Sequence, residues 1–233
     1  MNKAACVWSG GKDSALALYR AWQQGYDVQC LVTTASAQHQ RVTMHGVPLQ
    51  LIAQQAEAMI LPLHWVFLPE TTDAAVYDAK MLAMYQQLKA EGIDTLIFGD
   101  IHLEDLRAYR EVQASVAGMQ AVFPLLGTDV RSVLAEYWRL GFRAVICCAN
   151  DKLGESFAGA ELDPSTIDLM PLGTDLCGER GEYHTFVYAG PLFTNVFGGA
   201  IRITKGDIIR RIYADPVRAD GDVGFWFCDL QPQ

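Results

Sequence analysis

The feature that most constrains this chain is a glycine turn placed between an apolar run and a helical pattern. Residues 4–22 read "AACVWSGGKDSALALYRAW". The apolar run reaches Ser9, and after Asp13 the apolar residues recur every three or four positions, which is the spacing of an amphipathic helix. A strand, a glycine turn and a helix in this order are the opening unit of a parallel α/β fold.

The turn has the residues of a phosphate-binding loop. Two adjacent glycines allow a sharp bend and bring main-chain N–H groups close to an anion. The start of the following helix adds unpaired N–H groups and its dipole. A lysine supplies positive charge, an aspartate could hold Mg²⁺, and two serines supply hydroxyl donors. The predicted loop is Ser9, Gly10, Gly11, Lys12, Asp13 and Ser14. The alternative is a plain glycine turn with a solvated lysine.

Two better-known nucleotide motifs do not fit the turn. The P-loop requires glycine where this chain has Cys6, and serine or threonine where it has Asp13. The dinucleotide pattern G-x-G-x-x-G does not occur in the sequence. The turn therefore predicts a different kind of phosphate loop.

Strand and helix patterns alternate along the first two thirds of the chain. Such alternation predicts a parallel sheet that binds ligands beyond the carboxyl ends of its strands. That edge would carry 9–14, 33–37, Pro69-Glu70 and Gly99-Asp100. The strands are expected at 3–9, 27–35, 63–68, 94–100, 120–126 and 142–150, and the helices at 13–25, 48–59, 72–92, 102–118 and 129–141.

The pattern changes toward the C-terminus. After residue 150 the chain holds many glycines and short β-like runs at 185–190, 200–206, 208–214 and 224–230. We therefore predict a nucleotide-binding domain over 1–123 and a smaller α+β domain over 124–233.

Composition narrows the class of protein. The 233 residues are 51% hydrophobic, which is enough for a buried core, and the net charge of −9 disfavours a nucleic-acid partner. No apolar stretch is long enough to span a bilayer, and the start is not laid out as a signal peptide. The six cysteines form no C-x-x-C pair and are expected as buried thiols. We expect a cytoplasmic protein without a membrane or nucleic-acid partner. The sequence leaves open whether the protein forms a homodimer.

Two further segments carry candidate site residues. In "FGDIHLEDLRAYRE" (98–111), Gly99 and Asp100 follow a strand, and Arg107 and Arg110 are one helical turn apart. Two guanidinium groups there would suit phosphate or carboxylate oxygens, and the alternative is an exposed helix with surface ion pairs.

The second segment, 175–193, is the densest polar cluster in the chain. "DLCGERGEYHTFVYAGPLF" places carboxylates and a histidine around Gly178 and Gly181, just before a strand. Glu182 or His184 could act as a general base, and acids there could bind Mg²⁺ or a cationic group. The alternative is a charged hairpin loop.

The motif "SGGKDS" resembles the PP-loop of the ATP pyrophosphatases. That resemblance implies a Rossmann-like adenine nucleotide α-hydrolase (HUP-type) fold and cleavage of ATP between its α- and β-phosphates. Together with "HG" (45–46), "FGDI", "FPLLG" and "GERGEYHTFVYAGPLF", the chain resembles the diphthine–ammonia ligase family along nearly its whole length, in the form typical of bacterial relatives. Members of that family form an amide on a carboxylate of diphthine, using ATP and ammonia.

The resemblance assigns roles by position. It implies ATP and Mg²⁺ at the loop, with Lys12 and Asp13 catalytic and Asp13 as metal ligand. It implies an acceptor loop of Gly178, Glu179, Gly181, Glu182, Tyr183, His184 and Thr185. The chain departs from the family pattern at 106–110 and at Pro124-Leu125-Leu126, so the carboxylate acceptor, small-molecule or protein-borne, is left open.

Three functions are compatible with these residues. The first is a ligase that adenylates a carboxylate and transfers ammonia to it. The second is a tRNA-modifying enzyme with the same ATP chemistry, and the third is a non-catalytic module that binds adenine nucleotides. His45 precedes a helix at the same predicted edge, where it could contact ATP or be structural.

Overall fold

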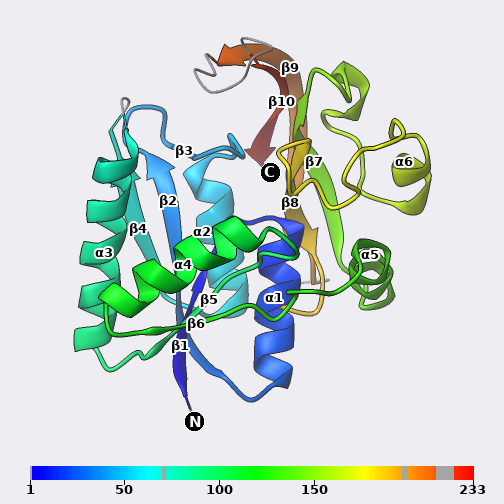
Figure 1. The fold of residues 1–233 in the computed structure, drawn as a ribbon. Coiled ribbons are helices and arrows are strands. Elements are labelled where there is room, and N and C mark those ends of the chain that lie inside the picture. Colours follow the sequence, from blue (N-terminus) through cyan, green and yellow to red (C-terminus); the bar gives the residue numbers. More distant parts are fainter. Residues whose placement is uncertain (1, 70–71, 196–198, 214–222) are drawn as a thin grey trace.

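The computed structural model describes residues 2–69, 72–195, 199–213 and 223–233. It contains a six-stranded, mainly parallel sheet A and a four-stranded antiparallel sheet B, with helices around both (Figure 1). This is the mixed α/β fold that the sequence predicts. Glu70, one residue of the predicted ligand-binding edge, lies outside the described residues.

Sheet A has a Rossmann-like strand order. Its parallel strands lie in the order β4-β2-β1-β5-β6, and β3 is added antiparallel to the end of β2. The central strand β1 pairs with β2 on one side and β5 on the other, so the connections diverge at its carboxyl end, where such folds bind ligands. The strands are β1 (Lys3–Val7), β2 (Asp27–Ser36), β3 (Arg41–Val42), β4 (Leu63–Leu68), β5 (Thr95–Ile97) and β6 (Gln120–Val122).

Helices cover both faces of sheet A. The helices α1 (Lys12–Gln23) and α2 (Leu49–Met59) lie on one face, and α3 (Ala74–Ala90) and α4 (Glu104–Val116) lie on the other (Figure 1). The side chains of β1 alternate between two apolar clusters: Ala4 and Cys6 belong to the α1–α2 cluster, and Ala5 to the α3–α4 cluster. This alternation is the two-residue period of a strand buried on both faces.

Sheet B packs against the face of sheet A that carries α1 and α2. Its strands lie in the order β8-β7-β10-β9, and α1 contacts β8 while α2 contacts β10. One apolar cluster includes Leu16 and Ile52 from these helices together with Val145 and Phe186 from sheet B. The remaining elements are α5 (Val130–Arg139), β7 (Arg143–Asn150), η1 (Glu155–Phe157), α6 (Pro164–Asp168), β8 (Tyr183–Ala189), β9 (Ile203–Tyr213) and β10 (Val223–Pro232).

The predicted elements agree with the structure in type and place. The predicted runs at 200–206 and 208–214 are largely one strand, β9, whose last described residue is Tyr213. Neither β3 nor α6 was predicted, because both are too short to show a period. The chain passes from sheet A to sheet B between Val122 and Arg143, but the shared core means that a division into two domains at residue 123 stays a prediction.

Within the described part of the chain, no helix is both long and apolar enough to cross a membrane.

The turn that leads into α1 requires glycine at position 10, and this predicts how substitutions there change the free energy of unfolding. Gly10 has φ +81°, and a Cβ there would lie 2.4 Å from Ile52 Cδ1. Gly25, beyond the other end of α1, has φ +84° with nothing within 4 Å of such a Cβ. Gly10→Ala should lower the free energy of unfolding in urea by about 3 kcal/mol or more, and Gly25→Ala by only about 1 kcal/mol, the backbone strain alone. Equal losses in the two variants would contradict the packing argument.

Candidate nucleotide-binding site

A cavity of about 360 Å³ opens where β1, β2 and β5 end. Its walls come from the loop after β1, from the residues after β5, from the turn after β3 and from the loop that leads into β8. This is the place that the strand order predicts for a ligand. The cavity is lined by these candidate residues: Ser9, Gly11, Lys12, Asp13, Ser14, Gly99, Asp100, Arg110, Gly178, Glu179, Tyr183, His184 and Thr185.

Backbone contacts fix the loop after β1. The carbonyl of Gly10 accepts hydrogen bonds from the N–H of Val187 in β8 (2.9 Å) and from Gln55 Nε2 (3.0 Å). A Cβ on Gly11 would lie 2.9 Å from His45 Cε1, and a Cβ on Gly99 would lie 2.8 Å from the carbonyl carbon of Asp13. Gly11 and Gly99 are therefore required by close packing against His45 and the backbone of Asp13, while their approach to a phosphate stays a prediction.

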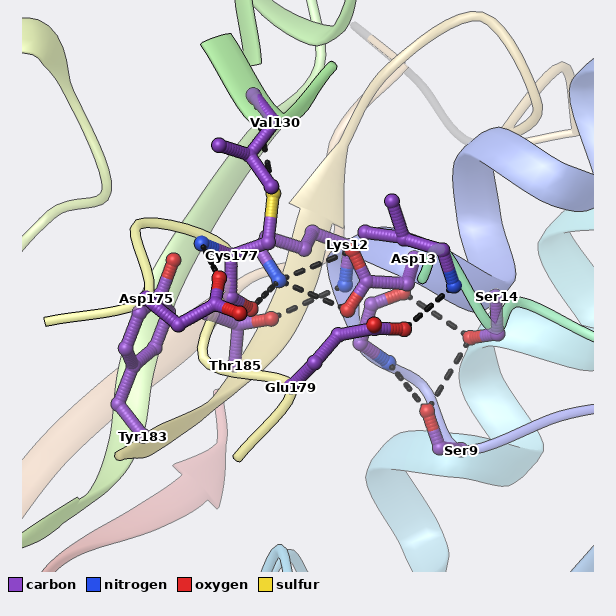
Figure 2. A network of polar contacts seen from close by, with 12 residues as sticks. Ser9, Lys12, Asp13, Ser14, Val130, Asp175, Cys177, Glu179, Tyr183 and Thr185 are labelled. Atoms are coloured by element: carbon purple, nitrogen blue, oxygen red, sulfur yellow. Dashed lines mark hydrogen bonds and ion pairs between the residues drawn. The ribbon is translucent and has the colours of Figure 1, made fainter. Parts of the chain in front are cut away.

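Lys12 is buried and makes polar contacts inside the protein (Figure 2). Its ammonium donates to both carboxylate oxygens of Asp13, at 2.7 and 2.9 Å, and to the carbonyl of Cys177. It also lies 5.1 Å from the centre of the Tyr183 ring. Burial has the largest single effect and lowers the pKa of Lys12, but the charges of Asp13, Tyr183 and Cys177 and the hydrogen bond to Asp13 together outweigh it and raise the pKa above its ordinary value. Lys12 is therefore a permanent cation in the wall of the cavity.

Two N–H groups of the glycine loop already have hydrogen-bond partners within the protein, which the sequence does not predict. The N–H of Lys12 donates to Thr185 Oγ1 (3.0 Å), and that of Gly11 to Ser9 Oγ (3.2 Å). The N-cap residue of α1 is Gly11, which has no side chain to cap the helix, and the N–H of Ala15 donates to the carbonyl of Gly11 (3.1 Å). The N–H groups of Asp13 and Ser14 precede that bond, and the hydroxyls of Ser9 and Ser14 lie 3.2 Å apart beside them, an arrangement that suits an anion.

The two arginines of α4 lie in different environments. Arg110 lines the cavity, with its Nε 3.9 Å from Asp100 Oδ2 and its guanidinium 5.1 Å from the centre of the Phe98 ring. Arg107 instead forms exposed ion pairs with Glu104 (3.3 Å) and Glu111 (2.9 Å). The prediction that both arginines face the ligand is wrong for Arg107, because neighbouring acids on the same helix hold it at the surface.

The acidic loop before β8 is tied to the segment after β5. Glu179 accepts hydrogen bonds from the N–H groups of Ile101 and His102, the latter at 2.9 Å, and its carboxylate lies 3.4 Å from the His102 ring. Asp175 contacts the same ring. Burial raises the pKa of Glu179, and the two N–H donors partly offset this effect. Glu179 therefore fastens sheet B to sheet A at the edge of the cavity.

Glu182 does not line the cavity and is not placed to act as a general base there. Its two oxygens accept hydrogen bonds from the N–H groups of Asp175 and Arg180, both at 3.1 Å. The carboxylate thus closes its own turn, which is the hairpin alternative for this residue. Gly181, at φ +82°, belongs to the same turn and does not line the cavity. Of the predicted phosphate loop, Gly10 is likewise absent from the cavity lining.

A pair of histidine rings forms one end of the cavity. His45 and His184 have ring centres 4.6 Å apart, and His45 Nδ1 donates to the carbonyl of Thr185 (3.0 Å). Burial lowers the pKa of His45 to about 4 and the pKa of His184 well below its usual range. His184 Nε2 is buried without a hydrogen-bond partner among the described residues. Both rings are neutral at pH 7, and the unpartnered Nε2 of His184 can accept a hydrogen bond.

Sequence reasoning missed Gln55. This buried residue of α2 accepts from Trp8 Nε1 (2.8 Å) and donates to the carbonyls of Gly10 and Val187 (3.0 and 2.7 Å). It therefore joins the end of β1, the glycine loop and β8. A single glutamine in a predicted helix gives no sign of such long-range contacts.

The described residues contain no cluster of three or more His, Cys, Asp or Glu side chains that could hold a metal ion alone. Asp13 and Asp100 both line the cavity. Mg²⁺ binds to proteins through one or two carboxylates and completes its shell with phosphate oxygens and water. These two residues therefore fit an ion that arrives with a nucleotide.

Comparison with known proteins gave one family and a set of structures. The model described as the diphthamide synthase N-terminal domain matches residues 2–121, from the start of β1 into β6. A predicted subunit of tRNA methyltransferase from Methanocaldococcus jannaschii is similar at 15% identity and a TM-score of 0.43, over 63% of this chain and 79% of that chain. A comparison with curated proteins gave no match.

The buried histidine pair predicts loss of stability in acid. The unfolded chain binds a proton at His45 near pH 6.5, whereas the native protein does so only near pH 4. The unfolded state therefore binds more protons within this window, and stability falls as the pH is lowered through it, by up to about 3 kcal/mol for His45. Urea unfolding at several pH values should show this decrease.

His45→Gln should make the decrease shallower, since His184 still contributes in the same direction. His39→Gln, at an exposed histidine, is the matched control and should leave the pH dependence unchanged. Identical pH profiles for His45→Gln and the wild-type protein would show that His45 is not protected from protonation.

Proposed function

This chain belongs to the diphthamide synthase family, and from that premise we propose that it is an ATP-dependent ligase. The family supports ATP chemistry of the PP-loop pyrophosphatase type. The proposed reaction activates a carboxylate as an acyl-adenylate, releases pyrophosphate, and transfers the acyl group to ammonia. The sequence leaves open which carboxylate is the acceptor.

One observation carries the proposal: the glycine loop after β1 and the start of α1 form the wall of a cavity at the point where the strand order diverges. Only glycine fits at positions 11 and 99 of that wall, because a Cβ at either would lie within 3.0 Å of a neighbouring atom. The uncapped first turn of α1 and the cation of Lys12 supply the positive potential that a polyphosphate needs.

The chain's own residues have separable tasks in this reaction. The acceptor carboxylate oxygen attacks the α-phosphorus, and the bond from that phosphorus to the bridging oxygen of the β-phosphate breaks. The first turn of α1, Lys12 and the hydroxyls of Ser9 and Ser14 stabilise the negative charge of the departing pyrophosphate. The nitrogen of ammonia then attacks the acyl carbon, and AMP leaves with the proton that the nitrogen loses. The Nε2 of His184, which has no partner among the described residues, can accept a hydrogen bond from the attacking nitrogen.

Mg²⁺, held by Asp13 and Asp100 together with the nucleotide, would reduce repulsion among the phosphates when bound. Arg110 lies beside Asp100, where its guanidinium can contact a nucleotide oxygen. Arg107, which lies outside the cavity, has no role in this scheme.

A non-catalytic nucleotide-binding module is the second candidate. The observation that favours it is that the Lys12 ammonium is already paired with Asp13 and the carbonyl of Cys177. Incubation with ATP, Mg²⁺, ammonium and a panel of carboxylates separates the two candidates. Formation of AMP and pyrophosphate that depends on the carboxylate supports the ligase, and ATP binding without AMP under every condition supports the module.

Lys12→Ala is expected to lower the rate of pyrophosphate release about 100-fold or more, because a charged donor to the leaving group is lost. Lys205→Ala is the control, since Lys205 forms an ion pair with Glu161 at the surface and lies outside the cavity. Circular dichroism should show that both variants are folded. An unchanged rate in folded Lys12→Ala would remove Lys12 from the proposed mechanism.

A further inference from the structure

A second cavity, of about 450 Å³, adjoins the nucleotide cavity. It lies between the turn after β3 and the face of sheet B formed by β9 and β10. Both cavities are lined by Val42, Thr43, Met44 and His184, so they meet at these residues. No role in ATP binding or catalysis has been assigned to this second cavity.

The floor of the second cavity is apolar and aromatic. Side chains from β9 and β10 alternate between the two faces of sheet B, and Ile209, Tyr213, Phe225 and Phe227 lie on the face that lines the cavity. The aromatic rings contact one another at centre distances of 6.0–6.4 Å. A ligand with an apolar or aromatic body would bury these rings.

The cavity is long in one direction. Ile209, Phe227, Cys148 and His184 lie opposite one another in successive strands of sheet B. Three strand spacings separate Ile209 from His184, which gives a length of about 14 Å. Arg211 lies opposite Phe225, two residues along the strands from the pair formed by Ile209 and Phe227. It is at the end of the cavity away from His184. The cavity thus fits an elongated molecule.

The two ends of the second cavity differ in charge. Arg41 donates to Asp229 (2.6 Å) and to the carbonyl of Gly46 (2.7 Å), so the charges of Arg41 and Asp229 offset each other. Arg211 also lines the cavity and forms no ion pair within the described part of the chain. The far end is therefore a site for an anion.

We propose that the second cavity binds the acceptor of the ligase as an elongated acid with two anionic ends and an apolar middle. One carboxylate enters the nucleotide cavity past His184, the body lies on Phe225 and Phe227, and the second anionic group pairs with Arg211. The assignment of the reacting end rests on the proposed function, whereas binding in the cavity does not.

The probe is sebacate, a linear ten-carbon dicarboxylate, measured by titration calorimetry without ATP. Its dimethyl ester, which has no free carboxylate, and the short dicarboxylate succinate are the comparison ligands. Sebacate should bind at least tenfold more tightly than succinate, because only sebacate reaches both ends. Arg211→Leu should weaken sebacate binding about tenfold, as expected for the loss of one charge-assisted pair, and leave binding of the ester little changed.

Arg210→Leu is the matched control. Arg210 is the neighbour of Arg211 on the opposite face of β9, where it pairs with Asp151 at 2.6 and 3.0 Å. Equal sebacate affinities in the two variants, or succinate binding as tight as that of sebacate, would overturn the proposal. If the expected binding pattern appears but sebacate and related acids yield no AMP with ATP, the cavity assignment stands and the ligase function fails.

Discussion

The site depends on the attachment of the glycine loop to β8. The loop follows β1 of sheet A, yet three of its polar contacts are made with sheet B or with residues that contact sheet B. The Gly10 carbonyl accepts from Val187, the Lys12 N–H donates to Thr185, and Gln55 joins Gly10 to Val187. The loop therefore takes its conformation only when both sheets are folded together. This agrees with the single apolar cluster that runs through α1, α2 and sheet B.

The sequence predicts the elements and the place of the site well, because both depend on local patterns. Glycines at 10, 11 and 99 mark bends and close approaches that no other residue fits, and the parallel sheet follows from the alternation of strands and helices. Most of the candidate residues line one cavity for this reason. The order of strands also explains why residues 90 positions apart in the chain, such as Ser9 and Gly99, share that cavity.

The failures concern side chains whose partners lie far away in the sequence or on the same turn. Both Arg107 and Arg110 are candidates from the sequence, but Arg107 has one acid three residues before it and one four residues after it, and these hold it at the surface, as the ion-pair alternative predicts. Glu179 and Glu182 come from one acidic loop, yet one fastens the loop to Ile101 and the other closes its own turn. Composition and spacing cannot distinguish a carboxylate that is free to bind a substrate from one that accepts hydrogen bonds from backbone N–H groups.

The histidine pair has a physical reason to be neutral. His184 lines both the nucleotide cavity, whose wall contains Lys12, and the second cavity with its aromatic floor, and His45 lies beside it in the nucleotide cavity. A positive charge on either ring would be buried and would be repelled by Lys12, so the imidazoles stay deprotonated. A neutral ring with one unpartnered nitrogen can accept a hydrogen bond from a ligand in the nucleotide cavity, and this is the role that burial leaves to His184.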